Sequence, residues 1–145
     1  MDRYFIVRIK LKILDISTLE KYDLEKMYKI YDKWPIISKE SYDFNHKKIR
    51  LKEIDHIVFA GMGGSGTIGD IFSSILSKTS IHVSIIKGYI LPKTINSNSL
   101  IIITSISGNT VETLNILDSA KKQSCKTIAI SSGGKMEKYC KDNNI

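Results

Sequence analysis

The sequence is poor in the residues that build disulfide-stabilised and metal-stabilised folds. Only two cysteines and three histidines occur among its 145 residues. Cys125 and Cys140 form no CxxC pair, and no histidine is spaced with them as a zinc ligand set requires. These absences exclude a disulfide framework and a zinc finger, and they favour a reducing compartment such as the cytoplasm.

Long apolar runs are also missing. No stretch approaches the roughly 18 uncharged apolar residues of a membrane span. Arg8, Lys10 and Lys12 interrupt any apolar core that a signal peptide would need. The apolar share of 42% and the charged share of 26% are those of an ordinary globular protein. We therefore expect a soluble cytoplasmic protein with no membrane partner, and a length of 145 residues indicates one hydrophobic core.

The chain is basic, with 22 lysine and arginine residues against 15 acidic ones and a net charge of +7. Most of these charges are dispersed among acidic or apolar residues. The densest basic cluster, residues 47–50, has no interleaved aromatic residues on which bases could stack. We therefore expect a solvated lysine-rich surface and no nucleic-acid partner.

Residues 1–52 are expected to form an extension that packs on the main domain. Apolar and charged residues alternate over 7–13, which predicts an edge strand with one solvated face. Apolar residues at helical spacing over 19–31 predict one long helix. We expect this helix to end at Pro35, because proline disfavours helical geometry in the residue before it. Residues 38–53 are predicted to be a turn or a short helix.

From residue 53 onward, strand-like and helix-like segments alternate. Four apolar runs predict strands, over 56–60, 81–86, 100–105 and 127–131. Because these strands are apolar on both sides and alternate with helices, residues 53–145 are predicted to form an α/β domain. Its sheet would be parallel, doubly wound in a flavodoxin-like or Rossmann-like manner, with about four to five strands flanked by helices. Ligands of such sheets bind beyond the carboxyl ends of the strands.

A glycine-rich loop follows the first of these strands. Its glycines allow positive φ and let backbone N–H groups approach an anion beside a helix N-terminus. The spacing of Gly61, Gly63 and Gly66 also fits a dinucleotide-binding fingerprint. That fingerprint requires an acidic residue at the end of the next strand, where Lys87 stands instead. A phosphate site is therefore favoured over a nicotinamide cofactor, although a lysine could accept the 2′-phosphate of NADP.

A second loop, residues 105–110, follows the third strand and is rich in hydroxyl groups. Asn109 and Glu112 resemble a capping pair that would begin a helix beside Ser107 and Thr110. Amide and hydroxyl donors would then point into one cavity, as a sugar phosphate requires. If the first and third strands are neighbours, both loops face the same crevice. The alternative role of these hydroxyl residues is helix capping and turn formation.

Four motifs, taken together and in order, carry a family resemblance. They lie at residues 61–70, 88–92, 105–114 and 130–135. This pattern resembles the SIS (sugar isomerase) domain, and within that family the N-terminal half of the bifunctional phosphoglucose/phosphomannose isomerases. The resemblance implies phosphate-binding residues Gly64, Ser65, Ser105, Ser107 and Thr110, and a supporting loop of Gly61, Gly63, Gly66, Gly108 and Asn109.

The reaction implied by the resemblance is the interconversion of glucose 6-phosphate or mannose 6-phosphate with fructose 6-phosphate, without metal or cofactor. In the family, the glutamate base and the ring-opening histidine lie in a second SIS half, so no catalytic residue is assigned here. His56 and His82 fall in predicted strands and are expected to pack rather than to catalyse.

Three hypotheses follow from the resemblance. The first is an isomerase chain that is active only with a second SIS half. It would form a homo-oligomer such as a dimer, or join a partner chain, across an exposed sheet edge. The second is a SIS module that binds a hexose phosphate as a sensor or regulator without catalysis. The third is a truncated remnant.

Overall fold

The computed structural model describes residues 15–45 and 48–145. The chain divides into two compact units, Met1–Ile49 and Arg50–Ile145. The described part of the first unit contains α1 (Ile16–Tyr22), α2 (Tyr28–Asp32) and α3 (Trp34–Asp43). None of these three helices contains a buried residue. The strand predicted over 7–13 lies outside the described residues.

The prediction of one long helix over 19–31 is wrong. Two short helices occur there, because Lys26 adopts a φ of +53° that no α-helix accommodates. The carboxylate of Asp23 instead accepts a hydrogen bond from the backbone N–H of Tyr28 at 3.0 Å. Pro35 also does the opposite of what was expected, since it lies in the first turn of α3. Its missing N–H costs nothing there, because the first N–H groups of a helix have no partner within the helix.

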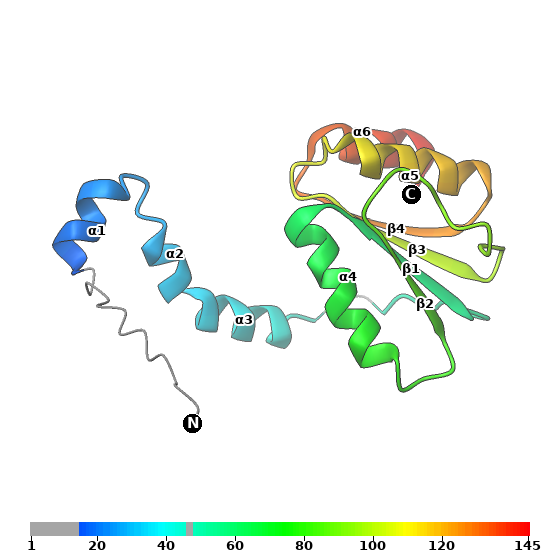
Figure 1. The fold of residues 1–145 in the computed structure, drawn as a ribbon, viewed down its shortest axis with the longest axis horizontal. Coiled ribbons are helices and arrows are strands. Elements are labelled where there is room, and N and C mark those ends of the chain that lie inside the picture. The colour runs from blue at the N-terminus through cyan, green and yellow to red at the C-terminus, as the bar shows by residue number, and fades with distance from the viewer. Residues whose placement is uncertain (1–14, 46–47) are drawn as a thin grey trace, which may run out of the picture. The chain divides into compact units, whose positions relative to one another are not determined.

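The second unit is a parallel α/β fold, as predicted. Its strands are β1 (His56–Gly61), β2 (His82–Ile86), β3 (Ser99–Thr104) and β4 (Lys126–Ile130). All pairs are parallel, and the order is β2-β1-β3-β4. The helices are α4 (Gly63–Leu76), α5 (Val111–Lys122) and α6 (Gly134–Asn143). Figure 1 shows α4 on one side of the sheet and α5 and α6 on the other.

Because β1 and β3 are neighbours, the loops that follow them lie at the same edge of the sheet. Gly61, at the end of β1, is in register with Thr104, at the end of β3. The chain leaves β1 for α4 on one face of the sheet and leaves β3 for α5 on the other face. The two loops therefore begin side by side at a switch point, the place where parallel sheets bind ligands.

The hydrophobic core fills the space between the sheet and α5. Val58 of β1 and Ile101 and Ile103 of β3 are fully buried there, with Ile116 and Leu117 of α5. Each such side chain contributes about 1.5–3 kcal/mol through its removal from water. This core holds both strands that carry the loops.

On the opposite face, glycines allow α4 to lie close against β1. A Cβ atom added at Gly69 would lie 2.8 Å from the Cβ atom of Phe59. One added at Gly66 would lie 2.7 Å from the carbonyl oxygen of Gly61. Phe59 also stacks on Phe72 of α4, with ring centroids 5.5 Å apart. The absence of side chains at positions 66 and 69 is therefore a packing requirement of α4.

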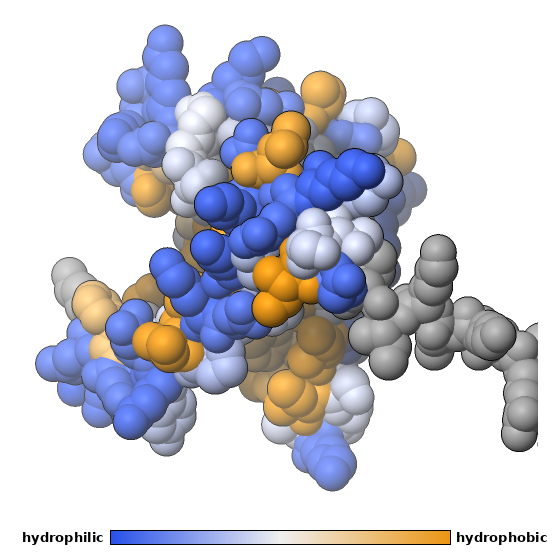
Figure 2. Space-filling view, turned by 90° about the vertical axis from the view of Figure 1, so that its left-hand side faces the viewer, coloured by the Kyte–Doolittle hydropathy of each residue, from blue (hydrophilic) through white to orange (hydrophobic). Residues whose placement is uncertain are grey.

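Large apolar side chains are exposed on the second unit, among them Ile71, Phe72 and Ile75 of α4. Figure 2 shows hydrophilic residues over most of the face that it presents, with hydrophobic residues in separate patches. Within 15–45 and 48–145, no helix is long and apolar enough to cross a membrane.

A histidine pair lies at the amino ends of β1 and β2, as far along these strands as possible from the loops. His56 is buried and His82 is exposed, and their rings lie 4.5 Å apart. His56 Nε2 and Ser84 Oγ are hydrogen-bonded at 2.9 Å. Burial lowers the pKa of His56, and the neighbouring His82 lowers it further. Packing was predicted for both residues, and the burial of His56 confirms it for that residue.

The lowered pKa of His56 predicts how stability depends on pH. The unfolded chain binds a proton at this histidine near pH 6.5, before the folded protein does. The free energy of unfolding should therefore fall as the pH drops below about 7, and this contribution should level off below the folded-state pKa. Urea unfolding at pH 7.5 and pH 5.5 measures the loss. His56→Gln should reduce it, whereas the exposed-site control His82→Gln should largely retain it, and equal losses in all three proteins would contradict this assignment.

Candidate functional site

The glycine-rich loop turns directly from β1 into α4. Gly63, the first residue of α4, has a φ of +52°, which favours glycine. The N-cap residue Met62 makes no side-chain capping hydrogen bond, so α4 begins without a side-chain partner for its first N–H groups. Gly64 is exposed, and apart from its neighbours and the backbone of its own helix no atom lies within 4 Å of the position that a Cβ atom would occupy. A ligand can therefore approach the backbone of this turn closely.

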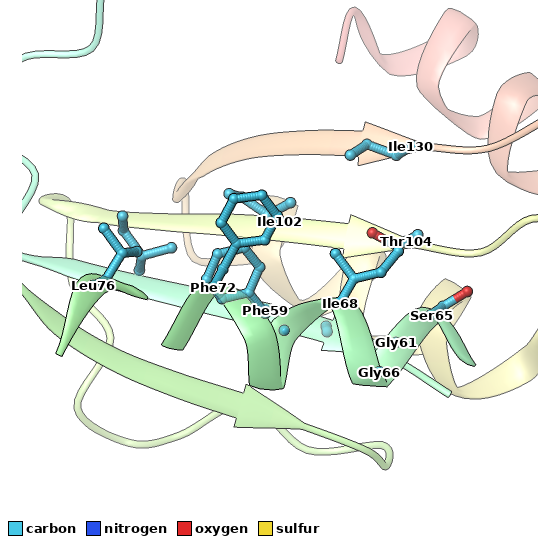
Figure 3. Close-up of a pocket in the computed structure, with 13 residues that line it drawn as sticks. Phe59, Gly61, Ser65, Gly66, Ile68, Phe72, Leu76, Ile102, Thr104 and Ile130 are labelled. Carbon is cyan, nitrogen blue, oxygen red and sulfur yellow. The ribbon is translucent and has the colours of Figure 1, made fainter. Parts of the chain in front are cut away.

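A cavity of about 280 Å³ opens beside the first turns of α4. Figure 3 shows Ser65, Gly61 and Thr104 at one end of it and the apolar side chains of Phe72 and Ile102 farther along. The cavity exists because α4 packs on β1 and β2 and leaves the same face of β3 less covered. It therefore has a polar end at the glycine loop and an apolar remainder.

In the hydroxyl-rich loop, two side-chain hydroxyl groups are joined by a hydrogen bond. The buried Ser105 donates from Oγ to Thr110 Oγ1 at 3.0 Å. Because Ser105 Oγ is the donor, the hydroxyl hydrogen of Thr110 is left to donate elsewhere. Thr110 is also the N-cap residue of α5 and makes no side-chain capping bond. Ser107 is exposed, and its Oγ accepts a hydrogen bond from the backbone N–H of Asn109 at 3.3 Å.

The predicted capping pair of Asn109 and Glu112 is wrong. Helix α5 begins after Thr110, so Asn109 lies outside the capping position. The Asn109 side chain donates to the carbonyl of Ser107 at 3.0 Å and accepts from the backbone N–H of Lys135 at 3.1 Å. Glu112 is hydrogen-bonded to the hydroxyl of Tyr89, which raises the pKa of that tyrosine. Asn109 therefore joins the hydroxyl-rich loop to the first turn of α6.

A third loop, residues 131–134, braces the second and was not assigned a role from the sequence. The backbone N–H of Ser132 donates to the carbonyl of Ile106 at 3.0 Å, and that of Met136 donates to the carbonyl of Gly108 at 2.9 Å. The loops approach so closely that a Cβ atom at Gly108 would lie 1.8 Å from the carbonyl oxygen of Gly133. The feature of the sequence that could have indicated this close approach is the glycine pair Gly133-Gly134, which follows the fourth predicted strand.

The structure brings together part of the predicted set. Ser65 and Gly66 line the cavity with Gly61, and Thr104 joins them although the sequence did not single it out. Ser107 and Thr110 lie outside that lining, in the neighbouring loop at the same edge of the sheet. Within the part of the chain that the structure describes, no cluster of three metal-ligating side chains occurs.

The chemistry of this edge suits an oxyanion with several acceptor oxygens. Two helices begin there without side-chain caps, and hydroxyl groups of Ser65, Ser107 and Thr110 accompany them. Helix N-termini carry a partial positive charge, and each hydroxyl can donate one hydrogen bond. Phosphate is the common ligand of such an arrangement.

Comparison with protein families assigns most of the second unit. The SIS domain model matches residues 50–143 of the chain. The match covers all four strands and the helices α4 to α6.

Curated relatives and a solved structure extend this finding. The bifunctional phosphoglucose/phosphomannose isomerase of Caldicellulosiruptor bescii is 37% identical over 98 residues, which cover 67% of this chain and 29% of the relative. That of Aquifex aeolicus is 32% identical over 127 residues, 82% of this chain and 37% of the relative. The chain thus spans about a third of the length of these relatives. The sugar isomerase domain of an RpiR transcription factor from Sphaerobacter thermophilus has the same fold, with a TM-score of 0.50, 15% identity, and coverage of 81% of this chain and 65% of that one.

The bracing of the two loops predicts a large effect of a small substitution. Gly108→Ala would place a methyl group against the carbonyl of Gly133 at a residue whose φ is +65°. We expect it to lower the free energy of unfolding by about 1–3 kcal/mol. Gly88→Ala is the matched control, because no atom lies within 4 Å of its added Cβ. Urea unfolding of both variants measures the difference, and equal stability would show that the loops are not locked together.

Proposed function

Because the chain belongs to the SIS domain family, we propose that its second unit binds the phosphate group of a hexose phosphate at the loops that follow β1 and β3. The observation that carries the proposal is the pair of uncapped helix N-termini, those of α4 and α5, beside the ends of adjacent strands. The hydrogen-bonded hydroxyl groups of Ser105 and Thr110 lie at the N-terminus of α5.

Each proposed phosphate ligand has a distinct part. A phosphate dianion only accepts hydrogen bonds, so every protein group that touches it must donate. Ser65, Ser107 and Thr110 supply hydroxyl donors, and the open backbone at Gly64 allows an oxygen to approach the turn. Ser105 acts indirectly, because its bond to Thr110 Oγ1 orients that hydroxyl.

We propose further that the chain takes part in the interconversion of glucose 6-phosphate or mannose 6-phosphate with fructose 6-phosphate, together with a second SIS half. The reaction moves a proton between C1 and C2, which requires a general base near the substrate. The described residues place no free base at the loops. His56 and His82 lie at the opposite ends of their strands. Glu112 is engaged by Tyr89, and Asp70 is paired with Lys87.

The same observation favours a second candidate function, sugar-phosphate binding without turnover by a sensor or regulator. The two candidates share the binding site and differ in whether a second SIS half completes a base beside it. Binding and catalysis must therefore be measured separately.

Titration calorimetry with fructose 6-phosphate, and with fructose as the unphosphorylated control, tests the binding proposal. We expect fructose 6-phosphate to bind and fructose to bind far more weakly, because the phosphate supplies the acceptor oxygens. Equal or absent binding of both would refute the proposal. An isomerase assay with and without an added second SIS half then separates the candidates, since turnover in its presence identifies an enzyme.

Removing one hydroxyl should weaken binding without unfolding the protein. Ser107→Ala and Ser65→Ala should each reduce the affinity for fructose 6-phosphate by about 1–3 kcal/mol, roughly 5- to 150-fold. Ser107 is exposed and Ser65 is only partly buried, so the melting temperature should stay near that of the unmodified protein. Ser74→Ala, at an exposed serine of α4, is the control and should leave affinity unchanged. A fall in melting temperature without a loss of affinity would assign Ser107 or Ser65 to the fold instead.

A further inference from the structure

We propose that Lys87 is the cation that recognises the phosphate group, and that Asp70 holds it aside until the ligand arrives. The inference rests on the proposed function and assigns to the same site a specificity-determining charge. Lys87 follows the last residue of β2, and Asp70 lies in α4. Lys87 therefore stands at the carboxyl edge of the sheet, and Asp70 lies midway along α4, where its carboxylate reaches the lysine.

The aliphatic stem of Lys87 lies against that loop. A Cβ atom added at Gly66 would lie 3.0 Å from Lys87 Cε and 3.2 Å from Lys87 Cγ. Gly66 directly follows Ser65, the proposed phosphate ligand in the first turn of α4. The lysine side chain therefore runs over the backbone of the turn that is proposed to hold the phosphate.

The ammonium group points away from the loop because Asp70 holds it. Lys87 Nζ lies 2.7 Å from Asp70 Oδ2. Asp70 is four residues after Gly66, about one helical turn farther from the start of α4. A rotation of the lysine side chain over roughly that length, about 5 Å, would bring its charge beside Gly66, next to Ser65 in the first turn of α4.

The ion pair is weak enough to exchange. The Lys87 and Asp70 side chains are 47% and 46% exposed, and exposed pairs of this kind are held loosely in water. A phosphate carries nearly two negative charges and three acceptor oxygens, against the single charge of a carboxylate. A dianion placed on the uncapped start of α4 would therefore compete with Asp70 for the lysine.

Charge balance supports this role. The other proposed ligands are neutral hydroxyl and amide groups, which supply donors without full charge. Lys87 also occupies the place where a dinucleotide-binding sheet carries the acidic residue that accepts from ribose hydroxyls. A carboxylate at this position accepts hydrogen bonds from the hydroxyl groups of a ligand. A lysine there donates instead, and therefore favours a ligand with anionic oxygens.

The test exploits the opposite signs expected of the two partners. Lys87→Gln should weaken fructose 6-phosphate binding about tenfold, because a charged donor is lost. Asp70→Asn should strengthen it roughly two- to fivefold, because the competing carboxylate is removed. In the double variant the gain from Asp70→Asn should vanish, since it acts only through Lys87. Lys78→Gln, beyond the last residue of α4, is the matched lysine control and should change little.

The measurements are titration calorimetry with fructose 6-phosphate and a thermal melt of each variant. A merely structural ion pair would be weakened by either substitution, and both variants would then lose stability and affinity together. Unchanged affinity in Lys87→Gln, or reduced affinity in Asp70→Asn, would overturn the inference while leaving the phosphate site in place. Absence of binding by the unmodified chain would overturn the proposed function and this inference with it.

Discussion

The close approach of α4 to β1 is the constraint on which the candidate site depends. Gly66 and Gly69 face Gly61 and Phe59 at distances that leave no room for a Cβ atom. This contact holds the first turn of α4 over the end of β1, and it places the cavity at the edge of the helix. It also leaves a bare backbone surface along which the stem of Lys87 can lie. The packing of α4 and the proposed phosphate site therefore depend on the same missing side chains.

In the other two loops, the backbone makes the structural hydrogen bonds and side-chain hydroxyl groups are left available. Backbone hydrogen bonds join the loop after β3 to the loop after β4, with the Asn109 side chain as an additional link. Because these bonds hold the loops in place, Ser107 and Thr110 are not needed as helix caps. A helix without a side-chain cap forgoes about 1 kcal/mol of stability. The sheet end thus retains donors for a ligand at the expense of local stability.

The parts of the structure that were predictable are those in which burial decides the conformation. The four strands lie within one or two residues of their predicted bounds, because long runs of isoleucine and valine suit strands that are covered on both faces. The exposed helices α1 to α3 were not predictable in detail, because no core selects between one helix and several. Pro35 and Asn109 were misjudged because the role of each depends on its position relative to a helix start, which sequence patterns locate to within only a few residues. The positions of Lys87 and Thr104 beside the glycine-rich loop depend on how β2 and β3 pair with β1, and the sequence alone does not reveal that pairing.

The apolar remainder of the cavity has a thermodynamic consequence of its own. Phe72 of α4 and Ile130 of β4 line it and are 45% and 50% exposed, so hydrocarbon from the helix and the sheet stays in contact with water. Whatever shields that strip would produce a negative change in heat capacity, whereas a small anion at the polar end would produce little. Calorimetry at several temperatures measures this heat-capacity change. It therefore distinguishes a ligand at the apolar end of the cavity from one at the polar end, even if both release the same heat at 25 °C.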